Sequence, residues 1–136
     1  MRSKVNSCYT YFAIKGNFNP DKITEILGLI PSQTWKIGDK RKYGNSYYDF
    51  ALWEYGKNEI YDVITENQMM ITISNLKLKI PLLQEIKQKY DVSFVLEVVP
   101  NIYIGESTPA LAPNREIIEF CYLTGTEIDI DLYINK

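Results

Sequence analysis

The segment TEIDIDLYIN, residues 126–135, alternates apolar and polar side chains along its whole length. Ile128, Ile130, Leu132 and Ile134 hold the even positions, and the odd positions from 127 to 133 hold three carboxylates and a tyrosine. Successive side chains of a β-strand point to opposite faces of its sheet, so this pattern predicts a strand with one buried face and one wet face.

The same two-residue period recurs in residues 7–15, 47–55 and 92–99, so the four segments can be sorted into two faces of one sheet. The face expected to lie under helices carries Phe12, Phe50, Phe94, Leu96, Ile130 and Leu132. The wet face is expected to carry Tyr9, Tyr11, Lys15, Tyr47, Asp49, Trp53, Glu97, Glu127, Asp129, Asp131 and Tyr133.

Capping residues mark a first helix after the first strand. Asn19 suits the N-cap, Pro20 suits the first helical position, and Gly28 suits the end of the helix. Its buried stripe is predicted at Ile23, Ile26, Leu27 and Ile30.

Three further helical segments are predicted. One begins at Glu59 with Asn58 as its N-cap and carries Ile60, Val63, Ile64 and Ile71. Residues 69–74 would also suit a short strand, although we prefer helix there. Another helix begins at Pro81. The last spans residues 113–123, ends at Gly125, and buries Ile117, Ile118, Phe120 and Cys121.

This order of elements predicts an α+β two-layer sandwich, in which helices cover one face of a mixed or antiparallel sheet of about four strands. The 136 residues are predicted to form a single domain, 1–136. Residues 31–46 and 100–112 are predicted to be long loops.

Composition excludes several classes of protein. No apolar run reaches 18 residues and residues 1–16 lack the apolar stretch of a signal peptide, so we expect no membrane span and a cytoplasmic location. The absence of histidine removes Ser-His-Asp and Cys-His catalysis and most transition-metal sites. Cys8 and Cys121 fall on apolar faces and are expected to be buried free thiols.

The loop WKIGDKRKYG, residues 35–44, gathers four cations beside aromatic rings. These residues suit contact with phosphate or nucleic acid, but Gly38 matches no phosphate-binding motif and the acidic sheet face would repel nucleic acid. A solvated loop with Trp35 anchored in the core is the second interpretation. A third is a ligand pocket formed by Trp35, Trp53 and the Lys40–Arg41 turn.

Several motifs together resemble a known family. The aromatic first strand, the helix ending in LGLIPSQTWKIGD (residues 27–39), the strand with Trp53 and the terminal IDIDLY (residues 128–133) are similar to the small bacterial proteins grouped as domain of unknown function 4279. The resemblance covers nearly the whole chain and implies a single domain of this fold. It implies no activity, but small bacterial domains of this type are sometimes encoded beside toxin genes as immunity proteins.

The wet face is the principal candidate for function. Carboxylates beside rigid aromatic rings suit docking of a basic protein partner, and an ordinary solvated face, or one covered by another part of the chain, is the competing interpretation. Asp129 and Asp131 lie two residues apart on this face, but no ligand spacing for Ca²⁺ or Mg²⁺ accompanies them. A glycosidase-like pair of carboxylates is a further, weaker possibility.

We therefore predict a non-enzymatic binding module such as a toxin-neutralising immunity protein, with no cofactor, metal, nucleic-acid or membrane partner. The alternative is a small-ligand-binding or enzymatic domain that uses the tryptophan pocket. No catalytic residue is predicted. The predicted binding residues are Tyr9, Tyr11, Tyr47, Trp53, Glu97, Asp129, Asp131, Tyr133, Trp35, Lys40 and Arg41.

Overall fold

Strand β1 (Ser7–Asn17) lies at the centre of the sheet in the computed structural model, which describes residues 6–60, 65–106 and 110–136. It pairs antiparallel with β3 (Ala51–Ile60) on one side and with β4 (Asp91–Tyr103) on the other. β4 continues through Pro100 to Tyr103, so the second predicted loop begins later than the sequence indicated.

The sheet has six strands, where the sequence predicted about four, and its order is β2-β3-β1-β4-β5, with β6 also paired to β4. β2 (Gln33–Trp35) lies inside the first predicted loop and pairs antiparallel with β3. β5 (Thr126–Ile130) and β6 (Tyr133–Asn135) share the alternating C-terminal segment, which breaks at residues 131–132. Both run parallel to β4.

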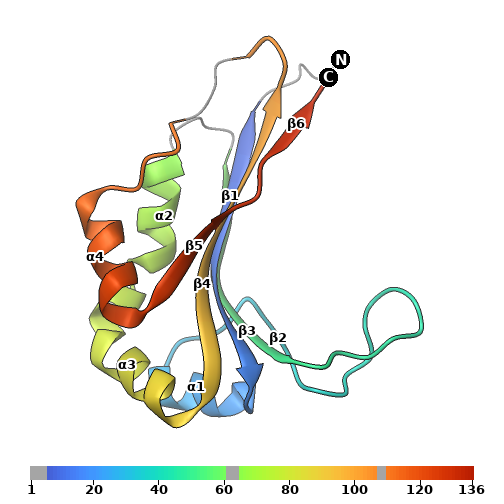
Figure 1. The fold of residues 1–136 in the computed structure, drawn as a ribbon, viewed down its shortest axis with the longest axis vertical. Coiled ribbons are helices and arrows are strands. Elements are labelled where there is room, and N and C mark those ends of the chain that lie inside the picture. The colour runs from blue at the N-terminus through green and yellow to red at the C-terminus, as the bar shows by residue number, and fades with distance from the viewer. Residues whose placement is uncertain (1–5, 61–64, 107–109) are drawn as a thin grey trace.

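Four α-helices of the described residues gather on one side of this sheet, while the other side carries none (Figure 1). They are α1 (Pro20–Leu27), α2 (Thr65–Ile73), α3 (Ile80–Lys89), which a 3₁₀ helix (Leu76–Lys79) precedes, and α4 (Arg115–Thr124). The predicted α+β two-layer sandwich is therefore confirmed. None of the described helices is long and apolar enough to cross a membrane.

The ends of α1 and α4 follow local capping chemistry. The Asn19 side chain accepts a hydrogen bond from the backbone N–H of Asp21 at 3.1 Å, and Gly28 ends α1 in the left-handed conformation. Asn114 caps α4 by accepting from the N–H of Ile117 at 2.9 Å. These side chains satisfy N–H groups that have no partner within the helix.

The core lies between the helices and one face of the sheet. Phe12, Phe94 and Leu96 are fully buried there as predicted, and Phe12 packs edge-on against Phe94, with ring centroids 5.6 Å apart. Cys8 and Cys121 are buried free thiols, as the sequence predicted. Burial raises the pKa of the Cys121 thiol to about 11, so it stays protonated at neutral pH.

Three residues assigned to the covered face are not buried under helices. Ile130 and Leu132 are 40% and 44% exposed, because the core takes in β5 only as far as Ile128. Phe50 precedes β3 and packs against Trp35 instead. Ile30, Ile71 and Ile118 were also predicted to be buried and are exposed.

The second predicted helix begins later than expected. Asn58 is not an N-cap but lies in β3, where its side chain donates to Thr10 at 3.1 Å and to Thr72 at 2.8 Å. Val63 and Ile64 lie outside the described residues. α2 then includes residues 69–73, so helix is the correct assignment for nearly all of the ambiguous segment.

A buried polar network fastens α2 to the sheet at this point. The Gln68 amide donates to the carbonyl of Cys8 and to the Asn58 side chain, and Thr10 and Thr72 share a hydrogen bond of 2.6 Å. Gly56 lies in a β-bulge of β3 beside this network, with a φ of 71° that glycine adopts readily.

Candidate functional site

The side of the sheet without helices carries most of the residues that the sequence placed on a wet face, and we call it the open face. Cross-strand pairing puts Tyr11 opposite Glu97 and puts Glu97 opposite Asp129. Asp131 follows β5 and accepts a hydrogen bond from the Tyr133 hydroxyl at 3.1 Å. The open face comprises Tyr9, Tyr11, Ala13, Lys15, Leu52, Glu54, Val95, Glu97, Val99, Glu127, Asp129, Asp131 and Tyr133.

The centre of the open face is withdrawn from solvent although no helix covers it. Glu97 is only 8% exposed and Glu54 only 5%, and Ala13 between them is fully buried. Glu54 accepts a hydrogen bond from the Ser32 hydroxyl at 2.8 Å. The sequence interpretation missed Glu54, because the parity assigned to residues 47–55 would have pointed its side chain into the core.

Glu97 and Asp129 form a carboxyl pair across β4 and β5. Burial raises the pKa of Glu97 to about 7, and the hydrogen bond and negative charge of Asp129 act in the same direction. Lys15 opposes this shift, and Asp131 adds to it. Because two adjacent carboxylates repel, the pair retains a proton near neutral pH.

Tyrosine rings surround the carboxyl pair. Tyr11 stacks with Tyr9 at a centroid distance of 6.3 Å. Its pKa lies well above the usual value, first because the ring is partly buried and then because Glu97 and Glu54 are close. The hydrogen bond to Asp131 likewise raises the pKa of Tyr133. The hydroxyls of Tyr11 and Tyr133 are therefore neutral hydrogen-bonding groups at physiological pH.

The open face is acidic. Among the side chains that the structure describes, it carries five carboxylates and Lys15, and the Lys57 ammonium lies 5.1 Å from the centre of the Tyr9 ring. Among the described residues, none of these carboxylates lies within ion-pair distance of a cationic side chain. Glu127, Asp129 and Asp131 are exposed, so their charge is available to a partner from solution.

Trp53, Tyr47 and Asp49 do not belong to this face, which corrects the sequence prediction. Trp53 is fully buried on the helix side of the sheet, where its indole N–H donates to the Thr24 hydroxyl at 3.0 Å. Tyr47 and Asp49 precede β3, and Tyr47 forms an isolated bridge with Lys40. The wet face predicted from residues 47–55 was therefore wrong in this part.

Residues 36–50, which we call the arm, hold the other predicted binding residues, Lys40 and Arg41. Trp35 anchors the base of the arm: it stacks on Tyr48 with centroids 3.8 Å apart and donates to the carbonyl of Phe50 at 3.0 Å. The Arg41 guanidinium lies 4.6 Å from the centre of the Tyr48 ring. Trp35 is thus half-buried in its own aromatic cluster and not anchored in the core.

The alternative pocket between the two tryptophans is contradicted by their positions. Trp35 lies opposite Leu52 in the sheet, whereas Trp53 lies opposite Thr34. Neighbouring positions of a strand point to opposite faces, so Trp53 enters the core while Trp35 remains on the other side. The two rings cannot line one pocket with the Lys40–Arg41 turn.

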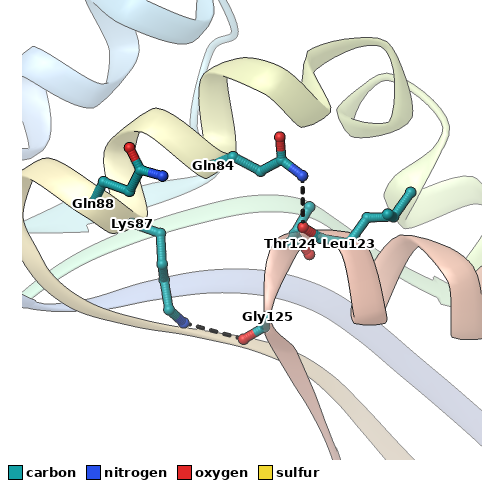
Figure 2. Close-up of a pocket in the computed structure, with 6 residues that line it drawn as sticks. All are labelled: Gln84, Lys87, Gln88, Leu123, Thr124 and Gly125. Atoms are coloured by element: carbon teal, nitrogen blue, oxygen red, sulfur yellow. Dashed lines mark hydrogen bonds between the residues drawn. The ribbon is translucent and has the colours of Figure 1, made fainter.

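A shallow depression lies between α3 and the end of α4 (Figure 2). Gln84 donates to the carbonyl of Leu123 at 2.9 Å, and the Lys87 ammonium donates to the carbonyl of Gly125 at 3.1 Å. These side chains satisfy carbonyls at the C-terminus of α4 that have no partner within the helix. The depression is therefore a joint between helices, in which Gln84 and Lys87 are already engaged.

No set of three or more Cys, Asp or Glu side chains that could hold a metal ion occurs in the described parts of the chain. No curated protein and no solved structure matches the chain. One family model does match, over residues 6–135, and its description carries no activity. Because that match spans nearly the whole chain, the protein belongs to the family described as domain of unknown function (DUF4279).

Proposed function

We propose that the protein is a non-enzymatic binding module whose open face docks a basic protein. The observation that carries this proposal is an acidic sheet face free of helices, on which the exposed Asp129 and Asp131 have no ion-pair partner among the described residues. Carboxylates without an ion pair leave a negative charge that a cationic group of a partner can neutralise.

On the open face, the exposed carboxylates would attract a cationic partner and the Tyr133 ring would supply contact area. Glu127, Asp129 and Asp131 create a negative potential that accelerates the approach of a cationic surface. Tyr133 is 49% exposed and its ring is oriented by the bond to Asp131, so it offers contact area at little entropic cost.

An immunity protein that neutralises a bacterial toxin is the most concrete form of this function. Such a protein needs a preformed surface that covers a cationic part of the toxin, and it needs no catalytic group. The open face supplies a preformed surface of that kind, since hydrogen-bonded strands hold its carboxylates in place.

A pair of matched variants tests the proposal once the partner has been isolated by co-purification. Asp129→Asn with Asp131→Asn removes two charges from the open face. Glu85→Gln with Glu119→Gln removes two exposed charges from the helix side. We expect only the first variant to slow association, by about tenfold, and to flatten its dependence on salt.

Tyr133→Ala should mainly raise the dissociation rate, by about fivefold or more, as expected when an aromatic contact is lost. Both rates can be measured by surface plasmon resonance at low and high salt. The proposal fails if the helix-side variant weakens binding as much as the open-face variant does.

A further inference from the structure

The arm carries the charge that the open face lacks. Between residues 40 and 47 it contains Lys40, Arg41 and Lys42 and no carboxylate. Within the described residues, none of these three cations forms an ion pair. Tyr43 and Tyr47 beside them are 80% and 60% exposed. The tip of the arm is therefore a basic, aromatic surface with no acidic counterpart of its own.

The arm is built in advance of any contact. Gly38 donates to the carbonyl of Tyr48 and Tyr48 donates back to the carbonyl of Asp39, at 2.8 and 2.9 Å. Arg41 donates to the carbonyl of Ser46 at 3.0 Å. Together with the stacking of Trp35 on Tyr48, these bonds fix the direction of the arm, so a partner that binds it loses little conformational freedom.

The arm and the exposed carboxylates lie at opposite edges of the sheet, because the arm joins β2 to β3 whereas Glu127 and Asp129 belong to β5. The arm joins β3 at Ala51, which pairs with Gly16, and Gly16 pairs with Val92 of β4. Asp129 instead pairs with Glu97 of β4. Five residues along β4 separate Val92 from Glu97, which corresponds to about 17 Å at the rise of a strand. Figure 1 shows the arm reaching away from the sheet on the side opposite the helices.

We propose that a second copy of this chain is a partner of the open face, and that each copy places its arm over the acidic end of the other. This inference rests on the proposed function, because it assumes that the open face docks cationic groups. A two-fold axis between two facing sheets, running diagonally to their strands, brings the arm at the β2–β3 edge of one copy opposite the acidic β5 edge of the other.

Such a dimer is self-complementary. Lys40 and Lys42 of each arm meet Asp129 and Asp131 of the facing copy, so the same charge contact forms twice. The two contacts are equivalent by symmetry and close the assembly at two copies. Tyr43 and Tyr47 of the arm then meet the Tyr133 end of the open face.

Charge reversal with rescue tests the dimer. The arm variant is Lys40→Glu with Lys42→Glu, which leaves Arg41 on Tyr48. The face variant is Asp129→Lys with Asp131→Lys. Sedimentation velocity of the full chain over a range of concentrations measures the monomer–dimer equilibrium, and circular dichroism establishes that each variant is folded.

We expect the wild-type chain to dimerise and each variant alone to dimerise at least about tenfold more weakly, because like charges then face each other. An equal mixture of the two variants should recover dimers, since reversed arms meet reversed faces and native arms meet native faces. Glu85→Lys with Glu119→Lys, on the helix side, should leave the equilibrium unchanged.

A wild-type chain that stays monomeric, or a dimer that neither variant weakens, overturns the inference, as does a mixture that remains monomeric. The proposed function is judged separately by the arm variant, whose open face is intact. If that variant still binds the co-purified basic partner, the proposed function stands even when the dimer does not exist. The dimer would cover the open face, so a basic partner that docks there must compete with dimerisation. If the dimer forms and the partner binds without competing with it, the proposed function fails.

Discussion

At the scale of single residues, the carboxyl group of Glu97 is the most unusual feature of the open face. It is nearly buried and lies beside Asp129, so its ionised form is disfavoured twice, by lost hydration and by repulsion. A glutamine of the same shape would remove the charge and keep the ability to form hydrogen bonds. The acid therefore carries a thermodynamic cost at neutral pH that an uncharged residue would avoid.

We expect the stability of the protein to depend on pH through Glu97. The folded protein binds its proton with a pKa of about 7, compared with 4.5 for an unperturbed glutamate. Between these two values the unfolded chain releases the proton first, so the free energy of unfolding should fall as pH rises from 4.5 to about 7. Urea denaturation across this range measures the effect.

Glu97→Gln should flatten the dependence of stability on pH. The matched control is Glu127→Gln, which changes an exposed carboxylate of the same face and should leave that dependence in place. Equal pH profiles for the wild type and Glu97→Gln would contradict the assignment of the raised pKa to this residue.

The two tryptophans should differ sharply in their contribution to stability. Trp53→Ala removes a fully buried ring from the core and should lower the free energy of unfolding by about 3–5 kcal/mol. Trp35→Ala removes a half-buried ring outside the core and should cost about 1 kcal/mol. Chemical denaturation followed by circular dichroism compares them, and the reverse ranking would contradict the placement of Trp53 in the core.

At the scale of elements, the junction of α2 with the sheet depends on one glycine. A Cβ atom on Gly56 would lie 3.0 Å from the carbonyl oxygen of Thr72, in a helix that the polar network holds in place. Gly28 has a similar φ, 67° against 71°, but nothing lies within 4 Å of its Cβ position. A substitution at Gly28 therefore tests backbone strain alone, whereas one at Gly56 tests backbone strain together with a steric contact.

Gly28→Ala should cost about 1 kcal/mol, the strain of a left-handed alanine. Gly56→Ala should cost clearly more, because α2 must also move away from β3. Thermal melts of the two variants provide the comparison. Equal losses of stability would show that α2 adapts to the added methyl group without cost.

The ends of α1 and α4 and most of the strands could be predicted from the sequence because their signals are local. Asn19, Pro20 and Gly28 act within a single turn, and the alternation of residues 7–15 spans one strand. β2 and the arm carried no such signal, since their order comes from Trp35, Tyr48 and Phe50, which meet only after folding. Asn58 resembled a cap in sequence but is satisfied by side chains from β1 and α2.

The candidate site could be predicted where one face of a strand is wet and the other is covered. That contrast holds for Tyr11 and Asp129, and at Glu97 a nearly buried carboxylate still alternates with the apolar Leu96 and Val98. It fails at residues 51–54 of β3, which are all between 0% and 5% exposed, so the alternation of polarity disappears. Glu54 was the remaining signal, because a parity that buries a carboxylate in the core is the less favourable one.

At the scale of the whole molecule, charge of opposite sign is separated across the sheet, with the basic arm at the β2–β3 edge and the exposed carboxylates at the β5 edge. A net charge of −2 conceals this separation. Interactions between copies therefore depend on orientation, and unlike charges meet where the β2–β3 edge of one sheet faces the β5 edge of the other.

Self-association should consequently weaken as salt is added. The distance over which exposed charges act falls from about 10 Å at 0.1 M salt to about 3 Å at 1 M, so the contacts between arm and open face lose most of their attraction. Sedimentation velocity at these two salt concentrations measures the change. A dimer that strengthens with salt would indicate apolar contacts in place of the proposed charge contacts.

The break between β5 and β6 has a consequence for aggregation. A long, regular outer strand offers unpaired backbone groups to any other chain and can seed fibres. Here that strand is interrupted at residues 131–132 and bears Glu127, Asp129 and Asp131 along its length. Two such edges repel each other and cannot align over more than five residues, so we expect this edge to be a poor template for fibril growth.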